Sequence, residues 1–260
     1  MRRLVLATLL FVPLGAYASD CKFEAPRNLT LDLAGVRVVQ VDMHSHELHL
    51  SGSPGAKVGT LTGHACASDQ KALDALVVTQ RREGDRLIVE TGEHNQLTIG
   101  FMGHRYYESS LQINLQLPPE VPVELNVGSG DAWVTGLNTL QAQIGSGDVH
   151  VSKISGPFTL SMGSGDLDAR DVGSLSIGSM GSGDIKVEGV AKDAHVGSIG
   201  SGDVSISSVG GSVRVDTLGS GDLRVRNVRG DFTVGAKGSG DISHSGVQGK
   251  VSVPRDRGDD

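Results

Sequence analysis

The sequence predicts an all-β fold, a single-stranded parallel β-solenoid with about 18–19 residues in each rung. Three observations lead to this prediction: a repeated tetrad, a nearly constant spacing, and alternating apolar residues between the tetrads. The tetrad Gly-Ser-Gly-Asp occurs seven times, and its aspartates are Asp131, Asp148, Asp166, Asp184, Asp203, Asp222 and Asp241. Their consecutive spacings are 17, 18, 18, 19, 19 and 19 residues. A nearly fixed period close to 20 residues is typical of a stacked repeat protein.

Each repeat contains two short strands, as the stretch "GSGDVSISSVGGSVRVDTL" illustrates. Val204 and Ile206 alternate with polar residues after the tetrad, and Val209 follows at a bend. Val213 and Val215 then alternate in a second strand. Alternation with a period of two places every second side chain on one face of a strand. No repeat has helical periodicity, so we expect each strand to pair in parallel with its equivalent in the next rung.

The tetrad is expected to form the turn between two strands. Glycine supplies backbone angles that are closed to other residues, and Ser and Asp side chains bond turn backbone groups. Stacked aspartates would lie about 4.8 Å apart, where two ionised carboxylates repel by roughly 3 kcal/mol at an effective dielectric near 20. We expect turn N–H groups to offset this repulsion. Ca²⁺ is the one cofactor left open for this ladder, although it prefers six to eight oxygen ligands.

Residues 1–18 are predicted to be a secretory signal peptide. A basic start, "MRR", precedes the apolar run 4–14 and the small-residue motif "AYA" before Ser19, which is the pattern of a cleaved leader. The apolar run is shorter than the roughly 20 residues that a membrane span needs, so no membrane span is expected. Cleavage after Ala18 would give a periplasmic or secreted protein. The net charge of −7 argues against nucleic acid as a partner.

Residues 19–120 are predicted to be an irregular β region that caps the solenoid and is contiguous with it. Strand-like segments occur at 35–43, 47–52, 85–92 and 111–117. A short helical turn fits 68–76, with Ser68 or Asp69 as its N-cap. Cys21 and Cys66 are the two cysteines of the chain, and an even pair in an oxidising compartment predicts one disulfide.

Residues 121–253 form the regular tetrad-containing solenoid, and residues 254–260 form a polar tail. Lys237 and His244 occupy positions that are apolar in the earlier repeats, as expected of a terminal rung. The open ends of a solenoid carry unpaired backbone groups. End-to-end self-association of two copies therefore remains open.

The tetrads and the preceding segment "LPPEVPVELNVGSGD" (117–131) resemble a known family. The chain is similar to the bacterial "putative adhesin" β-strand-repeat domain of unknown function, and to related domains that resemble autotransporter heads. The resemblance covers most of the chain after residue 18. It implies a right-handed β-solenoid that is exported to the cell envelope, and it carries over no catalytic or binding residues.

Two further clusters are candidate sites outside the ladder. His44 and His46 lie two residues apart in "HSHELH", on one face of an expected strand, and are weak candidates for zinc or copper ligands. Tyr106 and Tyr107 lie in "FMGHRYYESS", an expected loop, and loops on rigid scaffolds often carry recognition residues. The alternative for the tyrosines is that they cover the flank of the solenoid.

The sequence favours a binding or structural protein over an enzyme. Solenoidal polysaccharide hydrolases and lyases form a cleft from long insertions, whereas these repeats differ in length by at most two residues. We therefore expect an adhesin-like or structural protein whose partner is an envelope or extracellular protein or glycan. The alternative is a calcium- or polysaccharide-binding module that uses the stacked Asp and Ser residues.

Overall fold

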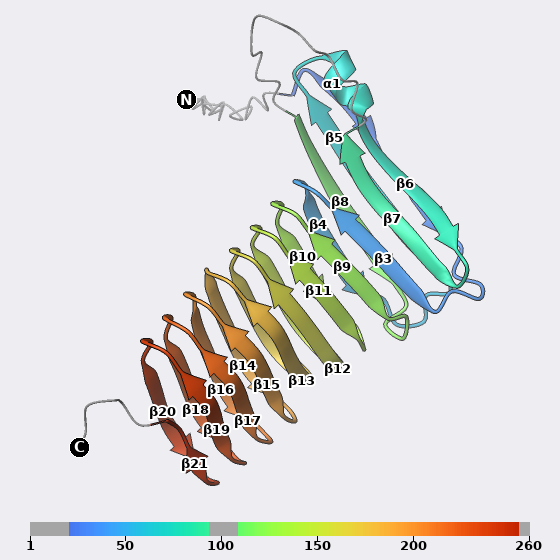
Figure 1. Cartoon of the computed structure of the whole chain (residues 1–260). Coiled ribbons are helices and arrows are strands. Elements are labelled where there is room, and N and C mark those ends of the chain that lie inside the picture. The colour runs from blue at the N-terminus through green and yellow to red at the C-terminus, as the bar shows by residue number, and fades with distance from the viewer. Residues whose placement is uncertain (1–20, 94–108, 255–260) are drawn as a thin grey trace, which may run out of the picture.

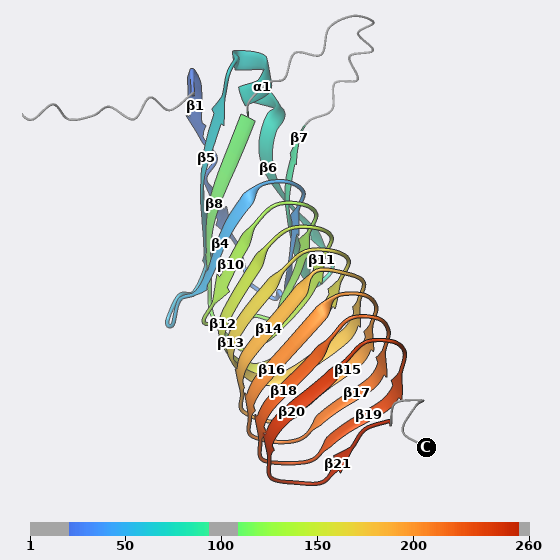
Figure 2. The same cartoon turned by 90° about the vertical axis from the view of Figure 1, so that its left-hand side faces the viewer.

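The computed structural model describes residues 21–93 and 109–254 of the chain (Figure 1). These residues form 21 strands and one short helix, α1 (Gln70–Ala75), and the strands join into one continuous sheet. The sheet coils into stacked rungs paired in parallel, which confirms the predicted β-solenoid (Figure 2). The predicted signal peptide, Tyr106, Tyr107 and residues 255–260 lie outside the described residues.

The strands that follow the tetrad corners stack in parallel along one side of the coil, and two earlier strands extend this stack at its N-terminal end. We call the strands on this side the first sheet. From the N-terminal end they are β8 (Ser109–Leu117), β4 (Glu47–Gly52), β10 (Ala132–Thr135), the first halves of β12 (Val149–Met162) and β13 (Leu167–Met180), β14 (Asp184–Val190), β16 (Asp203–Val209), β18 (Leu223–Val228) and β20 (Ile242–Val247).

The strands that precede the corners stack along the other side and form the second sheet. From the N-terminal end they are β7 (Arg86–Glu93), β3 (Val38–Met43), β9 (Val123–Val127), β11 (Leu140–Ile144), the second halves of β12 and β13, β15 (Ala194–Ile199), β17 (Val213–Leu218), β19 (Phe232–Lys237) and β21 (Val251–Ser252). β12 and β13 pass from one sheet to the other without a break.

The core lies between the two sheets and consists of the alternating apolar residues. Val204, Ile206, Val213 and Val215 are each at most 1 % exposed. Phe232 is fully buried in the second sheet. Polar residues between these positions point outward, so each sheet has one buried and one outer face.

The N-terminal end is closed by antiparallel strands, which the sequence did not predict. β5 (Gly59–Ala67) pairs antiparallel with β8, and β6 (Leu76–Glu83) pairs antiparallel with β7. β1 (Phe23–Pro26) and β2 (Leu29–Leu31) then pair antiparallel with β5. α1 connects β5 to β6 at this end of the molecule (Figure 1). The Asp69 side chain accepts a hydrogen bond from the Ala72 N–H and caps α1, so the predicted helical turn is confirmed.

A column of left-handed backbone conformations runs along the bend within each rung. Gly136, Gly189 and Gly246 have φ values of 74°, 81° and 66°. The residues aligned with them in the other rungs adopt similar φ angles of 54° to 61° without being glycine: Lys153, Asp171, Ser208 and Asn227. Asp and Asn enter this region more readily than most residues, but Lys and Ser rarely do, so the stacking of neighbouring rungs imposes the conformation on Lys153 and Ser208.

The C-terminal rung is less buried than the others, as expected of an end. Lys237 aligns with Leu218, and His244 aligns with Val225. The His244 ring lies 5.7 Å from the Phe232 ring, centroid to centroid. Val251 in β21 is 37 % exposed. Beyond β20 and β21 the described residues supply no further strand, so both present a free edge.

Candidate functional site

The seven tetrad aspartates lie exposed at one corner of the coil, one rung apart. Asp184 aligns directly with Asp203. Four of the seven carboxylates accept a hydrogen bond from the backbone N–H of the tetrad aspartate in the next rung. These links run from Asp148 to Asp131 (3.3 Å), from Asp184 to Asp166 (2.8 Å), from Asp222 to Asp203 (2.9 Å) and from Asp241 to Asp222 (3.1 Å).

These hydrogen bonds give the aspartate ladder a structural role. An N–H donor that points at a carboxylate offsets part of the repulsion between stacked negative charges. The donor comes from the neighbouring rung, whereas the sequence led us to expect a donor within the same turn. The serines of the tetrad add a second link, because the Ser239 hydroxyl donates to the Ser220 hydroxyl oxygen at 3.2 Å.

The second glycine of the tetrad is required by close packing between rungs. A Cβ atom at Gly147 would overlap the carbonyl oxygen of Gly130, and one at Gly221 would overlap that of Gly202. The expected reason, backbone angles open only to glycine, holds for Gly183, whose φ is 92°. No other tetrad glycine has a positive φ. The repeat therefore selects glycine mainly for its missing side chain.

A second Asp and Ser ladder lies at the opposite turn, just before each strand of the second sheet, and was missed from the sequence. The Ser212 N–H donates to Asp193 at 2.7 Å, and the Asp231 N–H donates to the Ser212 hydroxyl oxygen at 3.1 Å. The Lys250 N–H donates in turn to the Asp231 carboxylate at 2.8 Å. Polar residues at this position vary in type, so no fixed motif marks the ladder.

The segment with His44 and His46 forms a corner, not the expected strand. Met43 aligns with Val127 and Leu48 aligns with Ala132, so residues 44–47 occupy the place of the first tetrad, residues 128–131. His44 is exposed, and its Nδ1 lies 2.6 Å from the Thr91 carbonyl oxygen. His46 is 6 % exposed. The two imidazoles therefore do not share one face of a strand.

No group of three or more His, Cys, Asp or Glu side chains in residues 21–93 and 109–254 is arranged to hold a metal ion. The groove beside the His44 corner, about 640 Å³ in volume, contains Asp42 and Glu90. The Asp42 carboxylate already accepts hydrogen bonds from Gln40 (2.9 Å) and Asn126 (2.6 Å). The groove therefore has two carboxylates, those of Asp42 and Glu90, and hydrogen bonds already hold the Asp42 carboxylate.

Trp133 lies on the outer face of the first sheet between two histidines. Its ring centroid lies 4.8 Å from that of His49 and 5.5 Å from that of His150, with interplanar angles of 11° and 23°. The histidines cover both faces of the indole, although the side chain is 36 % exposed. Sugars commonly pack on an open aromatic face, and this stack does not offer one.

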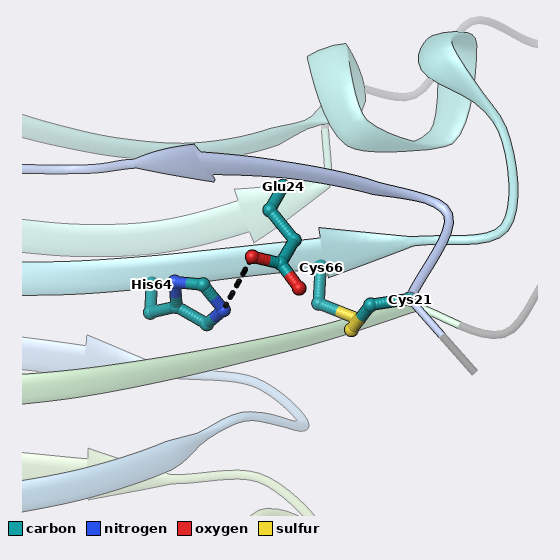
Figure 3. Close-up of a disulfide and its surroundings, with 4 residues drawn as sticks. All are labelled: Cys21, Glu24, His64 and Cys66. Atoms are coloured by element: carbon teal, nitrogen blue, oxygen red, sulfur yellow. Dashed lines mark ion pairs between the residues drawn. A yellow bond between two sulfur atoms is a disulfide. The ribbon is translucent and has the colours of Figure 1, made fainter. Parts of the chain in front are cut away.

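Cys21 and Cys66 form the predicted disulfide, with their Cα atoms 5.4 Å apart. Figure 3 shows the bond where the chain enters β1 and β5 ends, beside Glu24 and His64. The Glu24 and His64 side chains form an ion pair at 3.9 Å. The disulfide thus joins the N-terminal strand to the antiparallel cap.

Two side chains on the outer faces have shifted pKa values. Hydrogen bonding with His195, whose Nε2 lies 2.8 Å from the carboxylate, lowers the pKa of Asp216, and Arg214 adds to this effect. Hydrogen bonding with Glu124 raises the pKa of Arg86. The Asp216 contacts link neighbouring rungs, whereas Arg86 of β7 reaches across β3 to Glu124 of β9. Both side chains are partly exposed, Arg86 by 32 % and Asp216 by 39 %.

Residues 38–257 match the Toastrack DUF4097 family, so the chain belongs to that family. This match confirms the resemblance drawn from the tetrads and the segment before them. No curated protein matches the chain.

Several solved structures are similar to the chain. A "putative lipid binding protein" from Parabacteroides distasonis is 20 % identical, with a TM-score of 0.54 over 89 % of this chain and 97 % of that one. A "putative adhesin" from the same organism is 16 % identical, with a TM-score of 0.44 over 88 % and 94 %. At these identities the first likeness shows the fold alone. No helix within the described residues is long and apolar enough to cross a membrane.

Proposed function

We propose that this protein is an exported, non-enzymatic β-solenoid that acts as an adhesin-like or structural binding protein of the bacterial cell envelope. The observation that carries the proposal is the pair of long, flat outer faces, which consist of polar residues over a continuous apolar core. Such faces offer many repeated contacts to an extended partner, and the tetrad repeats, which differ in length by at most two residues, contain no long insertion that could form a catalytic cleft.

Export is supported by the leader-like sequence of residues 1–18 and by the disulfide between Cys21 and Cys66. Structural disulfides persist in oxidising compartments such as the bacterial periplasm. The cysteine pair therefore favours the periplasm or the cell surface over the cytoplasm.

The test is fractionation of the native bacterium, followed by mass spectrometry of the protein's N-terminus. We expect a chain that begins at Ser19 in the periplasmic or surface fraction. A chain that retains Met1 in the cytoplasm would overturn export.

In parallel, the purified mature protein is incubated with envelope polysaccharides. We expect the protein to sediment with one of them and to release no new reducing ends. Release of reducing ends would make it an enzyme.

The alternative function is cation or polysaccharide binding by the aspartate ladder. The observation in its favour is that all seven carboxylates are exposed in one row. Bound Ca²⁺ would offset the repulsion between them, as the backbone N–H groups also do. The two explanations differ in their dependence on calcium, because only a bound ion raises the unfolding midpoint when Ca²⁺ is added.

A further inference from the structure

The guanidinium groups of Arg224 and Arg226 in β18 and of Arg229 in the following turn are exposed and have no hydrogen-bond or ion-pair partner among the described residues. Every other arginine in the described ranges donates a hydrogen bond or forms an ion pair: Arg27, Arg37, Arg81, Arg82, Arg86, Arg170 and Arg214. The three partnerless arginines belong to one rung. We call them the arginine row.

The surroundings of the arginine row leave the guanidinium groups open. Ser205 and Ser243 flank Arg224 in the neighbouring strands, and Ser207 and Ser245 flank Arg226. Figure 2 shows β16, β18 and β20 side by side on one face. Serine side chains are short, so they do not cover the longer arginine side chains, and each adds a hydroxyl oxygen that can accept. The Ser207 hydroxyl already donates to the Val187 carbonyl oxygen at 3.4 Å.

The carboxylates nearest in sequence are already occupied. Asp222 precedes Arg224 by two residues, and its carboxylate accepts from the Asp241 N–H. Asp231 follows Arg229 by two residues, and its carboxylate accepts from the Lys250 N–H. Neither forms an ion pair with the arginine row. A chain with a net charge of −7 thus keeps three neighbouring positive groups available.

We propose that the arginine row binds an acidic polysaccharide, a ligand class that makes the proposed envelope-binding function more specific. Arginine holds a carboxylate through two parallel hydrogen bonds, and Arg224 and Arg226 point to the same side of β18, roughly 7 Å apart along the strand. The flanking serines pair with sugar hydroxyls. Arg229 continues the row into a groove of about 950 Å³ that Ser208, Asn227 and Gln248 also line. The one carboxylate of that lining, Asp171, lies three rungs away from Asn227.

A polysaccharide fits this surface better than a protein or a membrane. Protein interfaces centre on buried anchors in which Trp and Tyr are enriched beside Arg. The large exposed apolar residues in the described ranges are Val58, Trp133 and Val251, and the aromatic one, Trp133, lies in β10, far from β18 along the first sheet. An anionic membrane attracts polybasic segments, whereas this chain is acidic as a whole. A flat face with hydroxyls and guanidinium groups matches an extended polymer of hydroxylated, carboxylated units.

The test measures binding of the mature protein to polygalacturonate by affinity electrophoresis, with neutral dextran, poly-L-glutamate and phosphatidylglycerol vesicles as comparison probes. The test variant carries Arg224→Gln, Arg226→Gln and Arg229→Gln. The matched control carries Arg37→Gln, Arg170→Gln and Arg214→Gln, which remove the same charge from arginines that have partners. Circular dichroism confirms that both variants fold.

We expect the wild-type protein and the control variant to bind polygalacturonate, and the test variant to bind at least about tenfold more weakly. Dextran should not bind. If both variants lose the same amount of polygalacturonate binding, net charge explains the effect and the proposal is overturned. The proposal is also overturned if the wild-type protein does not bind polygalacturonate, or if it binds poly-L-glutamate or the vesicles equally well. These failures leave the proposed function intact if the mature chain is still found in the envelope and still sediments with another envelope polysaccharide.

Discussion

At the residue scale, the second glycine of each tetrad and the aspartate after it act in different ways on the same contact between rungs. The glycine lets the corner of one rung approach the carbonyl oxygen of the rung before it. The aspartate carboxylate then receives an N–H group from the rung after it. The tetrad therefore specifies the contact between rungs as much as the turn itself.

Substitution of Gly221 by alanine is expected to destabilise the fold by about 1–3 kcal/mol, because the added Cβ overlaps the Gly202 carbonyl oxygen and the rungs must separate. The measurement is the urea midpoint followed by circular dichroism. Gly92→Ala is the control, since no atom lies within 4 Å of a Cβ built there, and its midpoint should stay the same or rise slightly. Equal losses in both variants would contradict the packing explanation.

The lowered pKa of Asp216 predicts that its contribution to stability depends on pH. Its pKa is lowered in the folded protein, mainly by the hydrogen bond with His195. The stabilisation is therefore present above the unfolded pKa of about 3.9 and is lost as the pH falls through the lower folded value. Asp216→Asn should reduce the urea midpoint at pH 7 and have little effect near pH 2. A difference from the wild-type protein that persists unchanged at pH 2 would contradict this assignment.

The residues that the sequence predicted well are those with strong repetition. The tetrads gave the period, and the alternating Val, Ile and Leu residues gave the buried face. The sequence did not reveal the left-handed conformation of Lys153 or Ser208, because that conformation is imposed by neighbouring rungs and not by the residue itself. The arginine row was also missed, since the absence of ion-pair partners depends on which strands become neighbours.

At the element scale, the two ends of the solenoid are protected in different ways. The N-terminal end is covered by β1, β2, β5 and β6, which pair antiparallel, whereas the solenoid strands pair in parallel. Because an antiparallel strand runs back along its neighbour, it covers the edge of the terminal rung without forming another rung. The sequence predicted most of these strands only as irregular β structure, because their pairing direction leaves no trace in alternation.

We expect the disulfide to stabilise the antiparallel N-terminal cap locally. A loop of 45 residues closed by one bond restricts the unfolded chain by about 4 kcal/mol in the loop-entropy estimate. Replacing both Cys21 and Cys66 by serine should therefore increase hydrogen exchange in β1 and β5. β17 and β19 should keep their protection, because repeat proteins are stabilised through contacts between neighbours. Equal loss of protection in all strands would contradict a local role.

The C-terminal end depends on its own residues instead of a cap. Lys237 and His244 replace apolar residues in the last rung, and charge at an end discourages the docking of another sheet edge. Val251 and the edges of β20 and β21 remain accessible. End-to-end self-association therefore stays a prediction, and the polar residues of the last rung weigh against it.

At the scale of the whole molecule, the fold separates stability from recognition. The apolar core and the two ladders of Asp and Ser hold the rungs together, while the outer faces of both sheets vary from rung to rung. A change of residue on an outer face, such as Ser to Arg at positions 205 and 224, leaves the core unchanged. This arrangement allows one regular repeat to carry the proposed binding surface on a single rung.

The role of the aspartate ladder as a whole is tested by calcium. If backbone N–H groups offset the repulsion between carboxylates, thermal unfolding of the metal-stripped mature protein should not change in millimolar Ca²⁺. Asp203→Asn combined with Asp222→Asn should then leave the midpoint unchanged or raise it, because an asparagine oxygen still accepts the N–H and carries no charge. If the ladder instead binds Ca²⁺, the ion must raise the midpoint by mass action, and the double variant must abolish that rise. The second outcome would reject N–H compensation as a sufficient account and would make calcium a structural component of the tetrad corner.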